Sequence, residues 1–199
     1  MVRKSENHKI AVIVLHEIYG INNFIEEICI DYKMQGYDVF CPDMIQGKHF
    51  SYSDAAEAYH YFYNHNRLEY YKEIEDLVSK LKNTYNKVFI HGFSVGATIA
   101  WRCCEHPNCD GIICCYGSRI RDYMELQPLS PVLLLFARHD SFDVEIVAEQ
   151  LNGKSNIELH VLQASHGFMD PYSNCFDMEQ NQIAKMYIHR FFDKICYMG

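Results

Sequence analysis

The segment KVFIHGFSVGATIA, Lys87–Ala100, passes from a short apolar run to a helical pattern through a G-x-S-x-G turn. A run of this length predicts a buried strand, and the residues after the turn favour a helix. A serine on such a strand-to-helix turn is exposed, and the residues two places before and after it must be small. Gly92 and Gly96 meet that requirement around Ser94. We therefore predict that Ser94 is a catalytic nucleophile.

The rest of the chain repeats this rhythm of short apolar runs and longer helical patterns. The alternation predicts an α/β fold with a mostly parallel sheet and helices on both faces. The expected strands are Lys9–Leu15, Tyr37–Cys41, Lys87–His91, Gly111–Cys115, Pro131–Ala137 and Ile157–Gln163. The expected helices are Asn22–Gln35, Ser53–Asn64, Leu68–Leu81, Ala97–Glu105, Val144–Leu151 and Met178–Tyr197. We expect residues 1–199 to form one domain, without a large cap domain.

Composition and charge narrow the class of protein. The 199 residues are 49% hydrophobic and 22% charged, which excludes a disordered or low-complexity chain. The formal net charge is -8 and the longest basic run is Arg3–Lys4, so we expect no nucleic-acid binding. The longest apolar stretches, Ile10–Leu15 and Val132–Ala137, are far shorter than the roughly 20 residues of a transmembrane helix. We therefore expect no membrane span.

The nine cysteines include the adjacent pairs Cys103–Cys104 and Cys114–Cys115. Adjacent thiols suit a reducing compartment, and the charged N-terminal segment lacks a signal-peptide pattern, so we predict a cytoplasmic protein with most cysteines in its core. Cys103, Cys104, His106 and Cys109 are crowded but lack paired C-x2-C spacing, so we expect no metal site. The absence of a G-x-G-x-x-G or P-loop pattern argues against a nucleotide cofactor.

A serine hydroxyl is a weak nucleophile at neutral pH, so Ser94 needs a histidine base oriented by a carboxylate. In an α/β-hydrolase the chain order is serine, acid, histidine, with the last two in loops after strands. His166 follows the last predicted strand and is the candidate base. Asp140 follows the fifth predicted strand and is the candidate acid. Asp143 is the alternative acid, although it directly precedes a helical run and makes a natural N-cap.

Acyl transfer also needs backbone N–H groups aimed at the oxygen that becomes negatively charged. The amide of Val95, at the start of the helix after Ser94, is one candidate donor. The second should come from the loop after the first strand, His16–Gly20. We expect the amide of Ile18 to supply it.

Three blocks of sequence, in this order, resemble the dienelactone hydrolase family of α/β-hydrolases. The blocks are His16–Gly20 (HEIYG), Gly92–Ala97 (GFSVGA), and Asp140 followed by Ala164–Phe168 (ASHGF). The similarity covers nearly the whole chain and is weakest from Pro42 to Tyr85. The resemblance implies the same roles for Ser94, Asp140, His166 and the amides of Ile18 and Val95. It also implies that Glu17 lies beside the nucleophile and influences its activation, the alternative being a loop acid that caps or forms a salt bridge.

Two departures from the family pattern bear on the substrate. The founding enzymes use a cysteine nucleophile where this chain has Ser94, so we expect the ordinary serine mechanism. They bind a carboxylated lactone through arginines, one of them four residues after the catalytic histidine, where this chain has Asp170. An acid there would repel a carboxylate. Arg119 and Arg121 are the alternative partners for an anion, if they are not simply solvated surface residues.

The segment Pro42–Tyr71 holds eight Tyr or Phe residues and three His. It either lines or covers a pocket, or forms aromatic-rich helices that pack on the sheet.

These features together lead us to expect a serine hydrolase that cleaves a small ester or lactone through an acyl-enzyme, without a cofactor. The same triad would also serve a thioesterase, peptidase or acyltransferase. A non-catalytic binding protein on the same fold is the alternative from another class. The sequence leaves the oligomeric state open.

Overall fold

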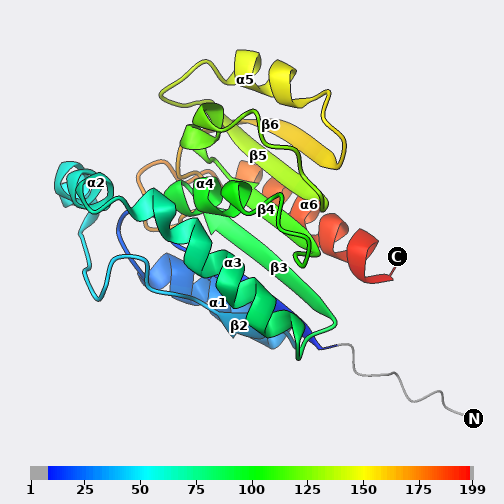
Figure 1. The fold of residues 1–199 in the computed structure, drawn as a ribbon. Coiled ribbons are helices and arrows are strands. Elements are labelled where there is room, and N and C mark those ends of the chain that lie inside the picture. The colour runs from blue at the N-terminus through cyan, green and yellow to red at the C-terminus, as the bar shows by residue number, and fades with distance from the viewer. Residues whose placement is uncertain (1–8, 198–199) are drawn as a thin grey trace, which may run out of the picture.

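Six strands form one sheet in the order β2-β1-β3-β4-β5-β6 (Figure 1). The computed structural model describes residues 9–197. The strands are β1 (Ile10–Leu15), β2 (Asp38–Phe40), β3 (Lys87–Phe93), β4 (Gly111–Cys115), β5 (Val132–His139) and β6 (Ile157–Ser165). All neighbouring strands are parallel, so their C-terminal ends lie along one edge of the sheet. The prediction of a parallel α/β sheet is confirmed.

Helices cover both faces of this sheet. They are α1 (Asn23–Met34), α2 (Ala55–Asn64), α3 (Tyr71–Lys82), α4 (Val95–Arg102), α5 (Val144–Leu151) and α6 (Met178–Tyr197), with short 3-10 helices at Tyr52–Asp54, Arg67–Tyr70 and Ser118–Asp122. Helices α3, α4 and α5 pack on one face, and α1 and α6 pack on the other (Figure 1). Helix α2 stands beyond the edge at which the strands end, and no large cap domain is inserted in the described residues.

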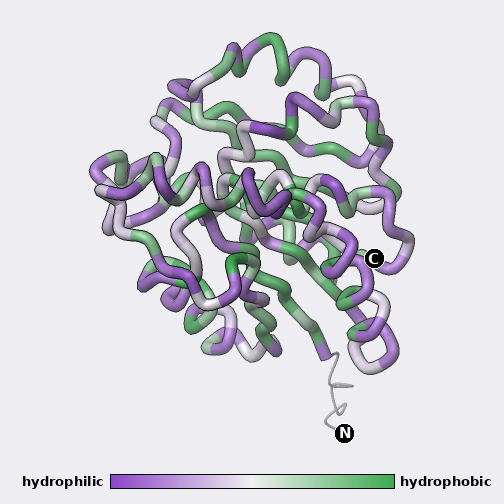
Figure 2. The backbone as a smooth tube through the Cα atoms, turned by 60° about the vertical axis from the view of Figure 1, so that its left-hand side comes forward, coloured by the Kyte–Doolittle hydropathy of each residue, from purple (hydrophilic) through white to green (hydrophobic). Residues whose placement is uncertain are grey.

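The core consists of two apolar clusters, one on each face of the sheet. Figure 2 shows the hydrophobic strands running through the interior, with hydrophilic positions concentrated on the surrounding helices. Six of the nine cysteines are buried, which agrees with the prediction that most are core residues. Among the described residues, no helix has the length and apolar character that crossing a membrane requires.

The turn around Ser94 differs in its bounds from the prediction. Strand β3 continues two residues beyond His91 because Gly92 and Phe93 keep their register with β4. Helix α4 starts directly after Ser94 and ends at Arg102 rather than Glu105, where two tight backbone turns close it. Ser94 is therefore the single residue between the end of β3 and the start of α4.

The chain before α2 also differs from the prediction. The expected helix Ser53–Asn64 begins two residues later, at Ala55. A 3-10 helix, Tyr52–Asp54, comes first, and the side chain of Ser51 accepts a hydrogen bond from the amide of Ser53 at 3.2 Å. The aromatic segment has both of its expected roles, because Phe62 is buried in the core whereas Tyr59 and Tyr63 line a cavity.

Candidate active site

Three predicted site residues follow directly on three strand ends. Ser94 follows β3, Asp140 follows β5, and His166 follows β6. Because the carboxyl ends of parallel strands meet at one edge, residues far apart in the sequence come together there. The extra length of β5 places Asp140 immediately after the strand, rather than three residues past it.

The backbone at Ser94 is strained, with φ 53° and ψ −115°. Close approaches on both sides explain the two glycines. A Cβ atom on Gly92 would lie 2.2 Å from the carbonyl oxygen of Gly96, and one on Gly96 would lie 2.4 Å from that of Leu15. Any larger residue at either position would therefore push the turn away from the sheet. The cost of holding Ser94 in this conformation is of a kind that clusters at functional sites.

A hydrogen-bonded chain links the three residues. Ser94 Oγ lies 2.9 Å from His166 Nε2, and His166 Nδ1 lies 2.7 Å from Asp140 Oδ2. The side chain of Asp140 is only 3% exposed, whereas that of His166 is 36% exposed. The carboxylate is therefore shielded from water, and the imidazole can reach a bound molecule. Ser141 fixes the other carboxylate oxygen of Asp140 through its amide, at 2.6 Å, and its hydroxyl, at 3.1 Å.

These contacts shift the pKa values of His166 and Asp140. Burial disfavours the charged imidazole, but the hydrogen bond and charge of Asp140, with a smaller contribution from Glu17, raise the pKa of His166 above its usual value. Burial also disfavours the Asp140 carboxylate, yet His166 and the Ser141 donors lower its pKa. Asp140 therefore stays ionised and favours the protonated form of His166.

The structure separates the two candidate acids. Asp143 is the N-cap of α5, and its side chain accepts a hydrogen bond from the amide of Ile146 at 3.2 Å. Asp140 is the one that bonds His166. The capping that the sequence suggested for Asp143 is confirmed.

The loop His16–Gly20 is fixed by its buried first residue. His16 Nδ1 donates to the carbonyl of Glu17 at 2.6 Å, and Nε2 accepts from the amide of Met44 at 2.9 Å. Burial lowers the pKa of His16, which keeps the imidazole neutral. Ile18 and Val95 line the same cavity as Ser94 and His166, where the sequence places the two oxyanion donors.

Glu17 is a buried carboxylic acid beside these residues, with 5% of its surface exposed. Burial raises its pKa to about 7, with a lowering effect from His166 and a further raising effect from Asp170. The nearby hydroxyl of Tyr116 has a smaller effect on this carboxyl and lowers the pKa of Glu17. Tyr116 has a left-handed backbone (φ 42°) and turns its ring edge-on to His166, with centroids 5.1 Å apart.

The three charged residues that bear on anion binding all have partners within the protein. Asp170 is buried, and burial raises its pKa while a hydrogen bond from Tyr52 lowers it. Arg119 Nε lies 2.9 Å from Asp122 Oδ2. Arg121 lies over the ring of Phe142 and donates to the carbonyl of Ser118. Both arginines are partly exposed, and neither lines the cavity around Ser94.

The cavity around Ser94 has a volume of about 410 Å³. Two tyrosines of α2, Tyr59 and Tyr63, form an aromatic wall with ring centroids 4.3 Å apart. Other lining residues that sequence reasoning did not single out are Ser118, His139, Ser141, Ser165 and Cys175. The two tyrosines lie within the aromatic segment Pro42–Tyr71, and no other sequence feature pointed to them as lining residues. Of the remaining five, two end strands, one begins a 3-10 helix and two lie in loops, and only Ser165 falls within a block quoted in the sequence analysis.

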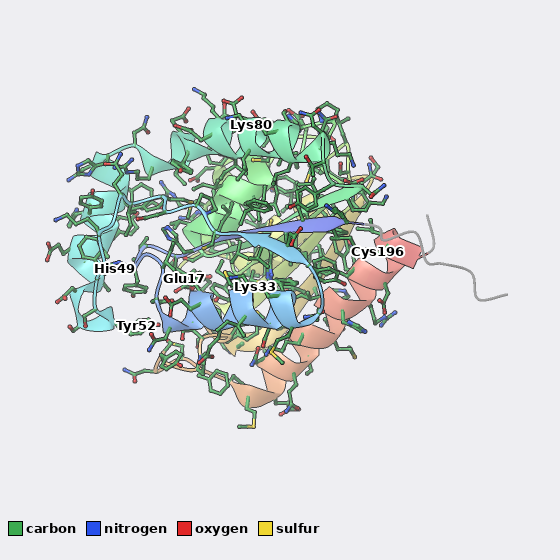
Figure 3. The ribbon with its side chains drawn as sticks, turned by 90° about the horizontal axis from the view of Figure 1, so that it is seen from below. Glu17, Lys33, His49, Tyr52, Lys80 and Cys196 are labelled. Atoms are coloured by element: carbon green, nitrogen blue, oxygen red, sulfur yellow. The ribbon has the colours of Figure 1, made fainter. Side chains whose placement is uncertain are left out.

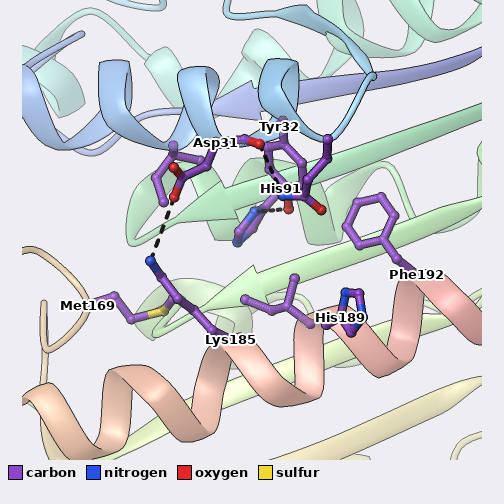
Figure 4. Close-up of a pocket in the computed structure, with 10 residues that line it drawn as sticks. Asp31, Tyr32, His91, Met169, Lys185, His189 and Phe192 are labelled. Atoms are coloured by element: carbon purple, nitrogen blue, oxygen red, sulfur yellow. Dashed lines mark hydrogen bonds and ion pairs between the residues drawn. The ribbon is translucent and has the colours of Figure 1, made fainter.

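A second cavity, of about 130 Å³, lies between α1 and α6 (Figure 4). His91 lies at its base, where Nδ1 is 2.8 Å from the hydroxyl of Tyr32, and burial lowers the pKa of His91 to about 3. Asp31 and Lys185 face each other across it, 3.7 Å apart. Both nitrogens of His91 have partners, since Nε2 lies 3.3 Å from Cys115 Sγ. The residues that line this second cavity include no serine.

A parallel sheet, a strained serine after β3, and an acid and a histidine after β5 and β6 define an α/β-hydrolase. The chain belongs to the dienelactone hydrolase family, whose model matches residues 1–195. It is 39% identical over 173 residues to the Bacillus subtilis (strain 168) protein YczH, covering 85% of each chain. The family makes this protein a hydrolase that acts on ester bonds.

Two solved structures share the fold. A candidate dienelactone hydrolase from Klebsiella pneumoniae has a TM-score of 0.74 at 18% identity, covering 96% of this chain and 90% of its own. A dienelactone hydrolase-like promiscuous phosphotriesterase from metagenomic libraries also has a TM-score of 0.74, at 16% identity, covering 94% of this chain and 87% of its own. The expected fold and family are thus confirmed.

Proposed function

We propose that this protein is a serine hydrolase that cleaves small, uncharged esters or lactones with a Ser94–His166–Asp140 triad. The observation that carries the proposal is the unbroken contact chain, 2.9 Å from Ser94 Oγ to His166 Nε2 and 2.7 Å from His166 Nδ1 to Asp140 Oδ2. A serine, a base and an orienting acid in this arrangement perform acyl transfer on several unrelated folds.

In the proposed reaction, Ser94 Oγ attacks the ester carbonyl and its proton passes to His166 Nε2. The amides of Ile18 and Val95 donate to the negatively charged oxygen of the tetrahedral intermediate. His166 then protonates the departing alkoxide, which leaves an acyl-enzyme on Ser94. Water, deprotonated by His166, attacks this ester, and the acid product leaves as Ser94 regains its proton. The chemistry uses only the chain's own groups and water.

Glu17 acts in this scheme through its charge on His166. Because a negative Glu17 favours the imidazolium, we expect Glu17→Gln to lower the pKa of His166. Only neutral His166 can accept the serine proton, so activity should rise with pH through a midpoint above 6.5 in the wild type. The midpoint should move to lower pH in Glu17→Gln. The pH profile of kcat/KM for a neutral aryl ester measures it.

The control for this experiment is Glu179→Gln, which removes an exposed carboxylate from the first turn of α6. Its profile should match the wild type. A Glu17→Gln midpoint that stays in place, or moves to higher pH, would show that Glu17 does not act on His166 electrostatically.

The preference for uncharged substrates follows from the charges around the cavity. Asp140, Glu17 and Asp170 lie at this edge, and the residues that line the cavity include no lysine or arginine. At roughly 8 Å and an effective dielectric constant of about 20, two like charges repel by about 2 kcal/mol. We therefore expect 3-carboxyphenyl acetate to have a kcat/KM at least about tenfold below that of 3-carbamoylphenyl acetate, its neutral analogue.

Initial rates with the two acetates, each corrected for its hydroxide-catalysed rate, test both the function and the preference. Added salt should narrow the gap, because ions screen charges over about 10 Å at 0.1 M. Turnover of neither ester, with no fluorophosphonate label on Ser94, would sink the proposed function. Faster turnover of the carboxylated ester would retain the function and assign anion binding to Arg119 or Arg121.

We also propose that the protein works in the cytoplasm. All nine cysteines are free, and the neighbours Cys114 and Cys115 are both buried. A chain with nine free thiols is typical of a reducing compartment, where disulfides rarely form.

A further inference from the structure

Tyr52 joins three segments that surround the candidate active site. It begins the 3-10 helix Tyr52–Asp54 that leads into α2, and Figure 3 shows it near the N-terminal end of α1, on the same side as Glu17. Its hydroxyl donates to Asp170 Oδ2 and accepts from Asn22 Nδ2, the latter at 2.9 Å. Its ring packs on the ring of Tyr19, with centroids 4.8 Å apart.

Two of these neighbours belong to loops that carry proposed site residues, and the third caps α1. Tyr19 directly follows Ile18 in the loop that carries a proposed oxyanion donor. Its carbonyl also accepts a hydrogen bond from the amide of Phe50, at 3.2 Å, two residues before Tyr52. Asn22 caps α1, accepting from the amide of Ile25 at 3.1 Å. Asp170 lies four residues after His166 in the loop that holds the base.

The two hydrogen bonds of the Tyr52 side chain engage its hydroxyl both as a donor and as an acceptor. Its hydroxyl makes one donated and one accepted bond, which satisfies the group. Asp170 is 1% exposed, whereas Tyr52 is 36% exposed. The amide of Tyr172 donates to the other carboxylate oxygen, Oδ1, at 2.9 Å, so the Tyr52 phenol is the donor to Oδ2. Loss of that donor would leave Oδ2 buried without its partner, which costs free energy. The buried carboxylate of Asp170 thus fixes the position of the partly exposed Tyr52 side chain.

We infer that Tyr52 is a positioning residue, which clamps the oxyanion loop His16–Gly20 and the histidine loop 164–172 in register with each other. Its ring holds the first loop through Tyr19, and its hydroxyl holds the second through Asp170. The clamp matters because displacements of about 1 Å in a reacting geometry cost on the order of 100-fold in rate. The expected effect of Tyr52 on the rate rests on the proposed function. The expected effect on the position of the two loops does not.

Tyr52→Phe separates the two halves of the clamp, because it retains the ring and removes the hydroxyl. We expect kcat for a neutral aryl acetate to fall about tenfold, with KM within twofold of the wild type. The rate constant for fluorophosphonate labelling of Ser94 should fall by a similar factor while the final labelled fraction stays complete. A purely structural role would instead lower the labelled fraction and leave the rate per active site unchanged.

The matched control is Tyr85→Phe. The Tyr85 hydroxyl also donates to a carboxylate, that of Asp38, but at the start of β2, the end of the sheet away from Ser94, and its loss should leave kcat unchanged. Asp170→Ala tests the other end of the contact, because alanine has no side-chain acceptor. Since both variants remove the same hydrogen bond, Tyr52→Phe combined with Asp170→Ala should be no slower than the slower single variant.

Amide hydrogen exchange measures how firmly Tyr52 holds the two loops, and it does not require turnover. Peptides covering 16–20 and 164–172 should exchange faster in Tyr52→Phe and at the wild-type rate in Tyr85→Phe. Faster exchange without Ser94 labelling in any variant would keep the clamp and remove the proposed function. Unchanged exchange together with an unchanged kcat would overturn the clamp, whatever the function.

Discussion

Ser94→Ala should abolish ester hydrolysis, lowering kcat on the order of 10⁶-fold, as removal of a triad serine does elsewhere. The acyl-enzyme cannot form without Ser94 Oγ, which lies 2.9 Å from its base. Alanine keeps a Cβ at the strained position, so we expect the turn and the thermal stability to change little. Initial rates with a neutral aryl acetate, and mass spectrometry after fluorophosphonate treatment, measure the loss of turnover and of label.

The chain supplies its own control for this experiment. Ser79 Oγ lies 3.1 Å from His106 Nε2, a second serine–histidine contact away from the sheet edge. The Nδ1 atom of His106 accepts from the amide of Asn108, at 3.3 Å, so no carboxylate orients that imidazole. Ser79→Ala should therefore leave both turnover and labelling unchanged. Equal activity of Ser94→Ala and wild type would exclude Ser94 as the nucleophile.

The contrast between these two serines shows why the sequence pattern singled out Ser94. The glycines around Ser94 are there because Cβ atoms would meet backbone oxygens at 2.2 and 2.4 Å. A close approach of this kind restricts residue type at fixed spacing, so it leaves a local pattern that can be read. Chain order and strand ends then led to Asp140 and His166, and capping separated Asp143 from them.

The residues that shape the site around the triad left no such pattern. Tyr52 and Asp170 are 118 positions apart, and their contact depends on how the segment after β2 folds over the strand ends. Tyr116 adopts a left-handed backbone that its side chain does not require. The burial that raises the pKa of Glu17 to about 7 comes from several segments together. These features come from tertiary packing, whereas strand and turn signals are local.

Asp140→Asn should lower kcat by about 10⁴-fold, the loss known for an orienting aspartate in a serine triad. The carboxylate accepts from His166 Nδ1 at 2.7 Å, which holds the proton on Nδ1 and leaves Nε2 free to accept from Ser94. An asparagine amide can donate to Nδ1 instead, which would move the imidazole proton to Nε2 and remove the base. It would also remove the charge that raises the pKa of His166.

Asp143→Asn is the matched control, because both residues are aspartates in the same loop and asparagine caps a helix about as well as aspartate. It should change neither kcat nor stability measurably. Initial rates and thermal unfolding of both variants, compared with the wild type, make the test. If Asp143→Asn lost activity while Asp140→Asn kept it, the acid would have been misassigned. If both kept it, His166 would act without an orienting carboxylate, and the contact at 2.7 Å would be structural only.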